Sequence, residues 1–178
     1  GDMHKLTPEK SQEIQFALGS DIKMAFDDCV HGEVSKKDNI RSVELTTKWS
    51  QRAKNRFLQL KKETGQKTQL YAIVQGAIDK KFRKRSLEEL REIGFDGYAF
   101  GGWPVDSEGN FLEDIIGFTA SLMPLEKPRY AMGVGQPMDI IKSVMLGYDL
   151  FDCVLPTRNA RHGYFYTSKG VVRIKRSQ

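Results

Sequence analysis

The feature that most constrains the fold is the alternation of short apolar segments with longer amphipathic ones along the chain. Short apolar runs are typical of buried strands, and apolar residues at helical spacing are typical of covering helices. A strand, a helix and a second strand in succession give a parallel pair, because the chain must cross back over the sheet. We expect strands over 21–26, 70–74, 97–100, 129–132 and 148–154, and helices over 8–18, 43–63, 82–93, 111–122 and 137–146.

Local signals mark the first helix and the end of the chain. Thr7 is a good N-cap and Pro8 a good first helical residue, with an apolar stripe expected from Ile14, Ala17 and Leu18. A polar loop is expected over 27–41. The last predicted strand leads through a loop with Pro156 and Arg158 to a β-hairpin, whose strands we expect over 163–167 and 171–175.

The predicted fold class is therefore α/β, a (β/α)8 TIM-type barrel of which only part is present, with a C-terminal β-hairpin. Five strands with helices between them make roughly half to two-thirds of such a barrel. A complete barrel takes roughly 250 residues, and this chain has 178. We expect one domain over 1–178. An open doubly wound sheet is the alternative, which periodicity alone does not exclude.

Composition narrows the class of protein. Hydrophobic residues make up 39% and charged residues 29%, as in globular proteins. No apolar run is long enough for a membrane span, and residues 1–5 contain no signal-peptide core. The only cysteines, Cys29 and Cys153, form no disulfide framework, and no Cys or His pair has the spacing of a zinc site. We therefore expect a cytoplasmic protein with no membrane contact and no metal ligands in this chain.

The charge distribution leaves two interpretations open. The net charge is +5, which suits either solubility or nucleic-acid binding. The C-terminal region mixes cations, which suit phosphates, with aromatic rings, which suit unstacked bases. These residues are Arg158, Arg161, His162, Tyr164, Phe165, Tyr166, Lys169, Arg173, Lys175 and Arg176.

Residues with chemical potential follow the predicted strands. In parallel sheets and barrels, functional groups gather at the carboxyl ends of the strands. Such a rim would hold a planar polar ligand, with glycines allowing close approach and a carboxylate left for nucleophilic or acid/base chemistry. The candidates are Asp27-Asp28-Cys29, Gln75-Gly76, Gly101-Gly102, Gly133-Val134-Gly135 and Asp152-Cys153.

Most candidates also have a structural interpretation. Asp27 and Asp28 are typical loop caps, Gln75-Gly76 is ordinary turn chemistry, and Gly133-Val134-Gly135 only partly matches a dinucleotide fingerprint. Asp152 is different, because we expect it in a largely buried strand end, where a carboxylate needs partners or a role. Cys29, Cys153 and Trp49 are most simply buried packing residues.

Taken in order, the motifs resemble the tRNA-guanine transglycosylase family over almost the whole chain. The most specific is Phe151-Asp152-Cys153-Val154-Leu155-Pro156-Thr157-Arg158. The others are His4-x-Leu6-Thr7-Pro8-Glu9, Leu18-Gly19-Ser20-Asp21-Ile22, Phe26-Asp27-Asp28-Cys29, Val74-Gln75-Gly76, Gly94-Phe95-Asp96-Gly97-Tyr98-Ala99 and Met132-Gly133-Val134-Gly135.

The resemblance implies a pentosyltransferase that exchanges the wobble guanine of tRNA for a 7-deazaguanine, in the queuosine pathway. Asp152 would be the nucleophile, forming a covalent aspartyl-ribose intermediate. Arg158 and Arg161 would lie near the tRNA backbone. The base would be bound by Asp27, Cys29, Gln75, Gly101, Gly102, Met132 and Gly133.

The chain also departs from the family pattern. The family's first strands, with a second active-site aspartate, and its Cys3His zinc site are absent, so zinc is expected only in full-length members. Trp103-Pro104 replaces a smaller pair after Gly102 and would reshape the base pocket, and Asp28 replaces glutamate. The resemblance leaves open a truncated or non-catalytic relative that binds tRNA or completes its barrel as a homodimer or with a partner chain. A paralogue acting on DNA is a third possibility.

Overall fold

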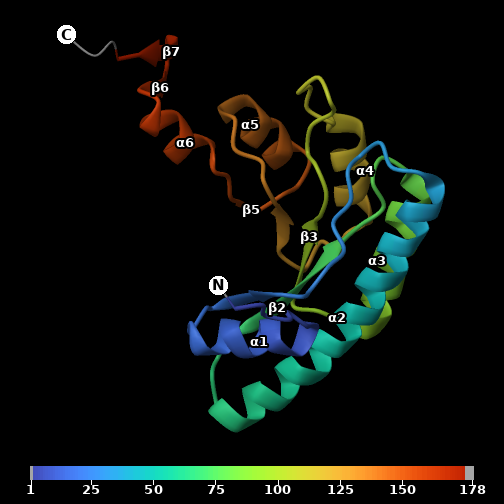
Figure 1. The fold of residues 1–178 in the computed structure, drawn as a ribbon. Helices are drawn as coiled ribbons and strands as arrows, with labels where there is room; N and C mark the ends of the chain where they lie inside the picture. The colour runs from blue at the N-terminus through green and yellow to red at the C-terminus, as the bar shows by residue number, and fades with distance from the viewer. Residues whose placement is uncertain (1, 175–178) are drawn as a thin grey trace.

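The computed structural model describes residues 2–174 as a parallel sheet wrapped by helices, followed by a separate hairpin (Figure 1). The five-stranded sheet has the order β1-β2-β3-β4-β5, and all neighbouring strands are parallel. Its strands are β1 (Ile22–Met24), β2 (Gln69–Val74), β3 (Gly97–Phe100), β4 (Arg129–Ala131) and β5 (Leu150–Phe151). The helices are α1 (Pro8–Ala17), α2 (Lys36–Thr64), α3 (Lys80–Ile93), α4 (Glu113–Leu122), α5 (Pro137–Met145) and α6 (Leu155–Arg161), and β6 (Tyr164–Thr167) pairs antiparallel with β7 (Gly170–Arg173).

The strand order decides between the two predicted architectures. A doubly wound sheet reverses its strand order at a switch point, whereas here each new strand is added on the same side of the last. The sheet therefore curls as a half-barrel of the TIM type, which confirms the predicted fold class. The C-terminal hairpin is also confirmed, although Lys175, which was expected in its second strand, lies outside the described residues.

The core lies between the curled sheet and its helices. The side chains of β2 and β3 are almost wholly buried, as expected for strands covered on both sides. Phe57 and Leu60 of α2 and Leu87 and Leu90 of α3 are buried in the same cluster. Helix termini follow their local signals: the Thr7 hydroxyl accepts from the Lys10 amide, and Gly65 ends α2 with a φ of 68°.

Three local predictions were wrong. The buried face of α1 is Pro8, Gln12 and Phe16, and the expected stripe of Ile14, Ala17 and Leu18 is exposed. The reason is that the Gln12 amide donates to the Met24 carbonyl at 2.8 Å, so a polar side chain belongs to the inner face.

The predicted loop over 27–41 becomes helical from Lys36, because Ser35 caps α2 by accepting from the Asp38 amide. The predicted loop at Pro156 is helix α6, since proline is well tolerated in the first turn of a helix. Consequently β5 ends at Phe151 instead of continuing to 154.

Among residues 2–174, no helix is long and apolar enough to cross a membrane.

Candidate active site

The carboxyl ends of β1 and β2 bring two of the predicted residues into direct contact. The Gln75 side-chain amide donates to Asp27 Oδ2 at 2.7 Å. Gln75 is fully buried, and its backbone N–H donates to the Ser86 hydroxyl at 3.1 Å. Within the described residues, Gln75 Oε1 is buried without a hydrogen-bond partner. The amide is therefore held in place with one acceptor still available.

Burial dominates the electrostatics of Asp27. It raises the pKa of this carboxyl above its ordinary value, although the hydrogen bond from Gln75 opposes the rise and the nearby Asp28 adds to it. Asp27 therefore takes up a proton at a higher pH than a solvated aspartate does. Asp27 and Gln75 together place hydrogen-bonding groups side by side after the ends of β1 and β2.

Cys29 and Gly102 belong to the same cluster. Desolvation raises the pKa of the Cys29 thiol, and the charge of Asp27 raises it further, while hydrogen bonds to the Gly102 backbone and Gln75 oppose the rise. The thiol is therefore neutral near pH 7. Cys29 is exposed as a residue, so the prediction that it is a buried packing residue was wrong. Cys153 is half-buried.

Asp152 directly follows β5 and is held at one carboxylate oxygen. The Tyr130 hydroxyl donates to Asp152 Oδ1 at 2.8 Å, and the Gly133 backbone N–H donates to the same atom at 3.0 Å. Gly133 has a φ of 74°, a conformation that glycine adopts readily. Among the described residues, no donor is bonded to Oδ2, so this oxygen can still accept a hydrogen bond.

The predicted burial of Asp152 was wrong. Asp152 is exposed, because β5 ends at Phe151, just before it, and the chain then continues into α6. Sequence reasoning also missed Tyr130, whose pKa is raised mainly by burial and then by its hydrogen bond to Asp152. The available signal was its position within the predicted strand over 129–132, two residues before Met132.

A hollow of about 390 Å³ lies beside Asp152. The hollow is within the size range of small-molecule sites, about 300–1,000 Å³. Trp103 and Pro104, the pair expected to reshape the pocket, line it together with Gly133 and Arg158. The Trp103 ring also contacts the His31 ring, with centroids 5.1 Å apart.

The predicted residues thus form two groups at one rim. Asp27, Cys29, Gln75 and Gly102 form the base-edge cluster, and Asp152, Gly133 and Arg158 border the hollow. The loop that starts at Gly101 connects the groups, since Gly102 belongs to the first and Trp103 to the second. Met132 is half-buried at the end of β4, and Arg161 is exposed on α6 outside the hollow's lining.

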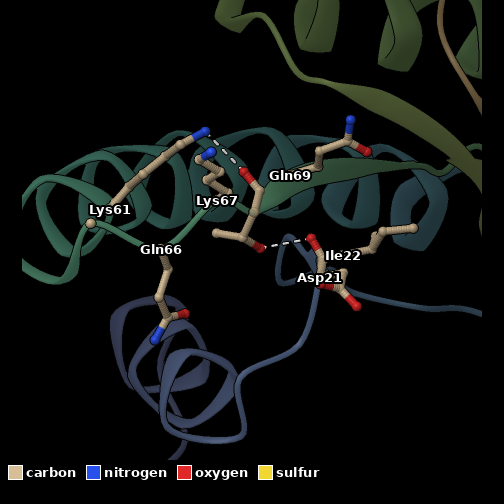
Figure 2. Close-up of a pocket in the computed structure, with 8 residues that line it drawn as sticks. Asp21, Ile22, Lys61, Gln66, Lys67 and Gln69 are labelled. Atoms are coloured by element: carbon tan, nitrogen blue, oxygen red, sulfur yellow. Dashed lines mark hydrogen bonds between the residues drawn. The ribbon is translucent and has the colours of Figure 1, made fainter.

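A larger hollow, of about 700 Å³, lies at the opposite end of the sheet (Figure 2). It is lined by residues before and at the starts of β1 and β2, including Asp21, Lys61 and Lys67. The Lys61 ammonium donates to the Thr68 carbonyl at 2.9 Å, so this side chain stabilises the turn before β2. In barrels this end generally serves stability, and none of the predicted site residues lies there.

Across residues 2–174, no three His, Cys, Asp or Glu side chains gather closely enough to hold a metal ion.

Fold and site together define an α/β protein of the TIM-barrel type, with its carboxylate, amide and glycine residues at the carboxyl rim. A family model described as queuine tRNA-ribosyltransferase matches residues 1–178. The chain belongs to that family.

Individual members of the family are similar to this chain over nearly its whole length. The queuine tRNA-ribosyltransferase of Actinobacillus succinogenes is 45% identical over 178 residues, covering 100% of this chain and 46% of the relative. That of Mannheimia succiniciproducens is 44% identical with the same coverage. That of Blochmanniella floridana is 45% identical over 173 residues, or 97% of this chain and 45% of the relative. The chain therefore spans just under half the length of these relatives.

Proposed function

We propose that the protein containing this chain is a tRNA-guanine transglycosylase, which exchanges the wobble guanine of tRNA for a 7-deazaguanine. The observation that carries the proposal is the geometry of Asp152. One carboxylate oxygen accepts from Tyr130 and Gly133, at 2.8 Å and 3.0 Å, and the other has no donor among the described residues. The residue is exposed and borders a hollow. A fixed carboxylate with one available oxygen suits a nucleophile that forms a covalent sugar intermediate.

The proposed reaction balances without a further reactant. Asp152 Oδ2 attacks C1′ of the ribose, and the bond between C1′ and guanine N9 breaks. Guanine leaves with the electron pair of that bond and takes up a proton. The incoming base then attacks C1′, loses a proton, and restores the Asp152 carboxylate. Two displacements at one carbon retain its configuration, as in retaining glycosidases.

Base selection is assigned to the cluster around Asp27. The Asp27 carboxyl and the buried Gln75 amide would pair with the base's polar edge, where Gln75 Oε1 has no partner in the described part of the chain. The Gly102 backbone would bind the base carbonyl. Met132 would contact the ring face, and Gly133 would leave room for it.

The tRNA itself would contact α6 and the hairpin that follows. Arg158 and Arg161 are exposed on α6, and Arg158 borders the hollow beside Asp152. Cations at this position suit the phosphates on either side of the exchanged nucleotide. The nucleotide must leave its stack to reach Asp152, as in other enzymes that act on a base.

The test is incorporation of radiolabelled guanine into tRNA that carries guanine at the wobble position. The full-length protein should incorporate label, and Asp152→Ala should abolish incorporation without loss of fold, as judged by circular dichroism. A folded Asp152→Ala protein with wild-type incorporation would refute the proposal. Salt-sensitive tRNA binding without any exchange by the wild-type protein would instead favour the non-catalytic relative.

A further inference from the structure

Arg83, on α3, is buried under the base-edge cluster. Its side chain is only 1% exposed. Nε donates to the Ala77 carbonyl, and Nη1 donates to the Val74 and Gly101 carbonyls, all at 2.8 Å. The guanidinium also lies 4.1 Å from the centroid of the Phe100 ring. One side chain thus connects the end of β2, the loop after it and the end of β3.

No carboxylate balances this buried charge among the described residues. None of the ion pairs formed within residues 2–174 includes Arg83. Burial lowers the pKa of Arg83 to about 10, so the side chain remains charged at pH 7. Burying an arginine costs free energy that only well-placed acceptors offset. The three carbonyls supply those acceptors in a geometry that the planar guanidinium fits.

The three carbonyls flank the backbone that carries the base-edge cluster. Val74 directly precedes Gln75, and Gly101 directly precedes Gly102. The Val74 carbonyl also accepts from the Gly101 amide at 3.0 Å. Arg83 therefore fixes the distance between two loops that come from different strands.

The backbone of the base-edge cluster packs closely against Arg83 and Gln75. A Cβ added at Gly102 would lie 3.4 Å from Arg83 Nη2, and one at Gly101 would lie 2.6 Å from the Gln75 amide nitrogen. A Cβ at Gly76 would collide with the backbone of Arg83. The backbone at Gly76 and Gly102 therefore lies close to Arg83, and that at Gly101 lies close to Gln75, so we expect a change at Arg83 to reach the cluster.

We propose that Arg83 is a positioning residue for base recognition, holding Gln75 and the Gly102 backbone at the spacing that the base edge requires. The inference rests on the proposed function. It assigns Arg83 no contact with the substrate: its role is exerted entirely through the three carbonyls.

Arg129 provides a matched control. It is also a buried arginine, 7% exposed, that donates to backbone carbonyls, including that of Met123 at 2.9 Å. It begins β4, at the opposite end of the sheet from the base-edge cluster. Each arginine donates three side-chain hydrogen bonds to backbone carbonyls, although two of those from Arg129 are longer, at 3.4 Å. We expect only Arg83→Lys to disturb the cluster.

The experiment compares Arg83→Lys, Arg83→Met and Arg129→Lys in the full-length protein. For Arg83→Met we expect KM for guanine to rise about 10- to 100-fold, because small misplacements of binding groups are costly. Arg83→Lys should recover part of that loss. Arg129→Lys should lower the melting temperature and leave KM for guanine within about twofold of wild type. Equal KM values in the Arg83 and Arg129 variants would overturn the proposal.

Amide hydrogen exchange supplies a readout that does not depend on activity. Segments 74–77 and 100–103 should both lose protection in Arg83→Lys and keep it in Arg129→Lys. Equal loss in the two variants would overturn the positioning role. A wild-type protein that incorporates no guanine would contradict the proposed function instead, and the exchange pattern would then decide the role of Arg83 by itself.

Discussion

Under the proposed mechanism, removing the Tyr130 hydroxyl should increase the population of the covalent intermediate. In the structure this hydroxyl donates to Asp152 Oδ1 at 2.8 Å, and it stabilises the charged carboxylate. In the covalent intermediate the same oxygen is an ester carbonyl with much less charge. Tyr130→Phe therefore raises the free energy of the carboxylate more than that of the ester, and shifts the equilibrium toward the ester.

The size of the shift follows from the bond that is lost. A hydrogen bond to a charged group contributes about 1.5–3 kcal/mol, which corresponds to roughly 10- to 150-fold in an equilibrium constant. The Gly133 N–H still donates to the same oxygen at 3.0 Å, so we expect the lower part of that range. Displacement of Asp152 by the incoming base should slow, because that step regenerates the carboxylate.

The assay quenches steady-state reactions in denaturant and measures the fraction of protein attached to tRNA on a denaturing gel. Tyr148→Phe is the control, because the Tyr148 hydroxyl donates to the Ile116 carbonyl at 3.1 Å and is buried in the core. Tyr130→Phe should increase the attached fraction and lower kcat, whereas Tyr148→Phe should lower stability alone. An unchanged attached fraction with unchanged kcat in Tyr130→Phe would refute the reasoning.

Three further predictions test other parts of the site. Burial raises the pKa of Asp27, so the folded state binds the carboxyl proton more tightly than the unfolded state does. Stability should therefore fall as pH rises from the ordinary aspartate range through the raised pKa. Urea titrations across that range should show a shallower fall for Asp27→Asn. A Cβ at Gly135 would overlap the Cys153 side chain, so Gly135→Ala should cost about 1–3 kcal/mol of stability in thermal melts, whereas Gly32→Ala, which meets only Ile78 at 3.5 Å, should cost little. Arg158→Ala should weaken tRNA binding and reduce the slope of log affinity against log salt by about 1, measured by filter binding, and an unchanged slope would remove Arg158 from the tRNA contact surface.

Much of the fold could be predicted because it depends on local patterns. Apolar runs such as 70–74 and 97–100 are covered on both sides, and their composition alone indicates buried parallel strands. The inner face of α1 could not be predicted in this way. It is set by the Gln12 amide bonding to the Met24 carbonyl, a contact between distant residues that no periodicity reports.

The candidate site could likewise be predicted only in part. The polar residues after the strands were found because parallel strands end at a common edge. Asp152 was expected to be buried, yet it is exposed, since the chain enters α6 where the sequence suggested a longer strand. Arg83 was missed because charged residues on a helix are usually solvated. Its spacing to Leu87 and Leu90, which share the buried face of α3, was the available signal.

The most direct test of the account is to locate the covalent bond. The full-length protein would be incubated with wobble-guanine tRNA without a free base, quenched in acid, and digested with nuclease and protease for mass spectrometry. The account predicts a ribosyl adduct on the peptide containing Asp152, absent from Asp152→Ala. An adduct on any other residue, or base exchange that continues without an adduct at Asp152, would contradict it.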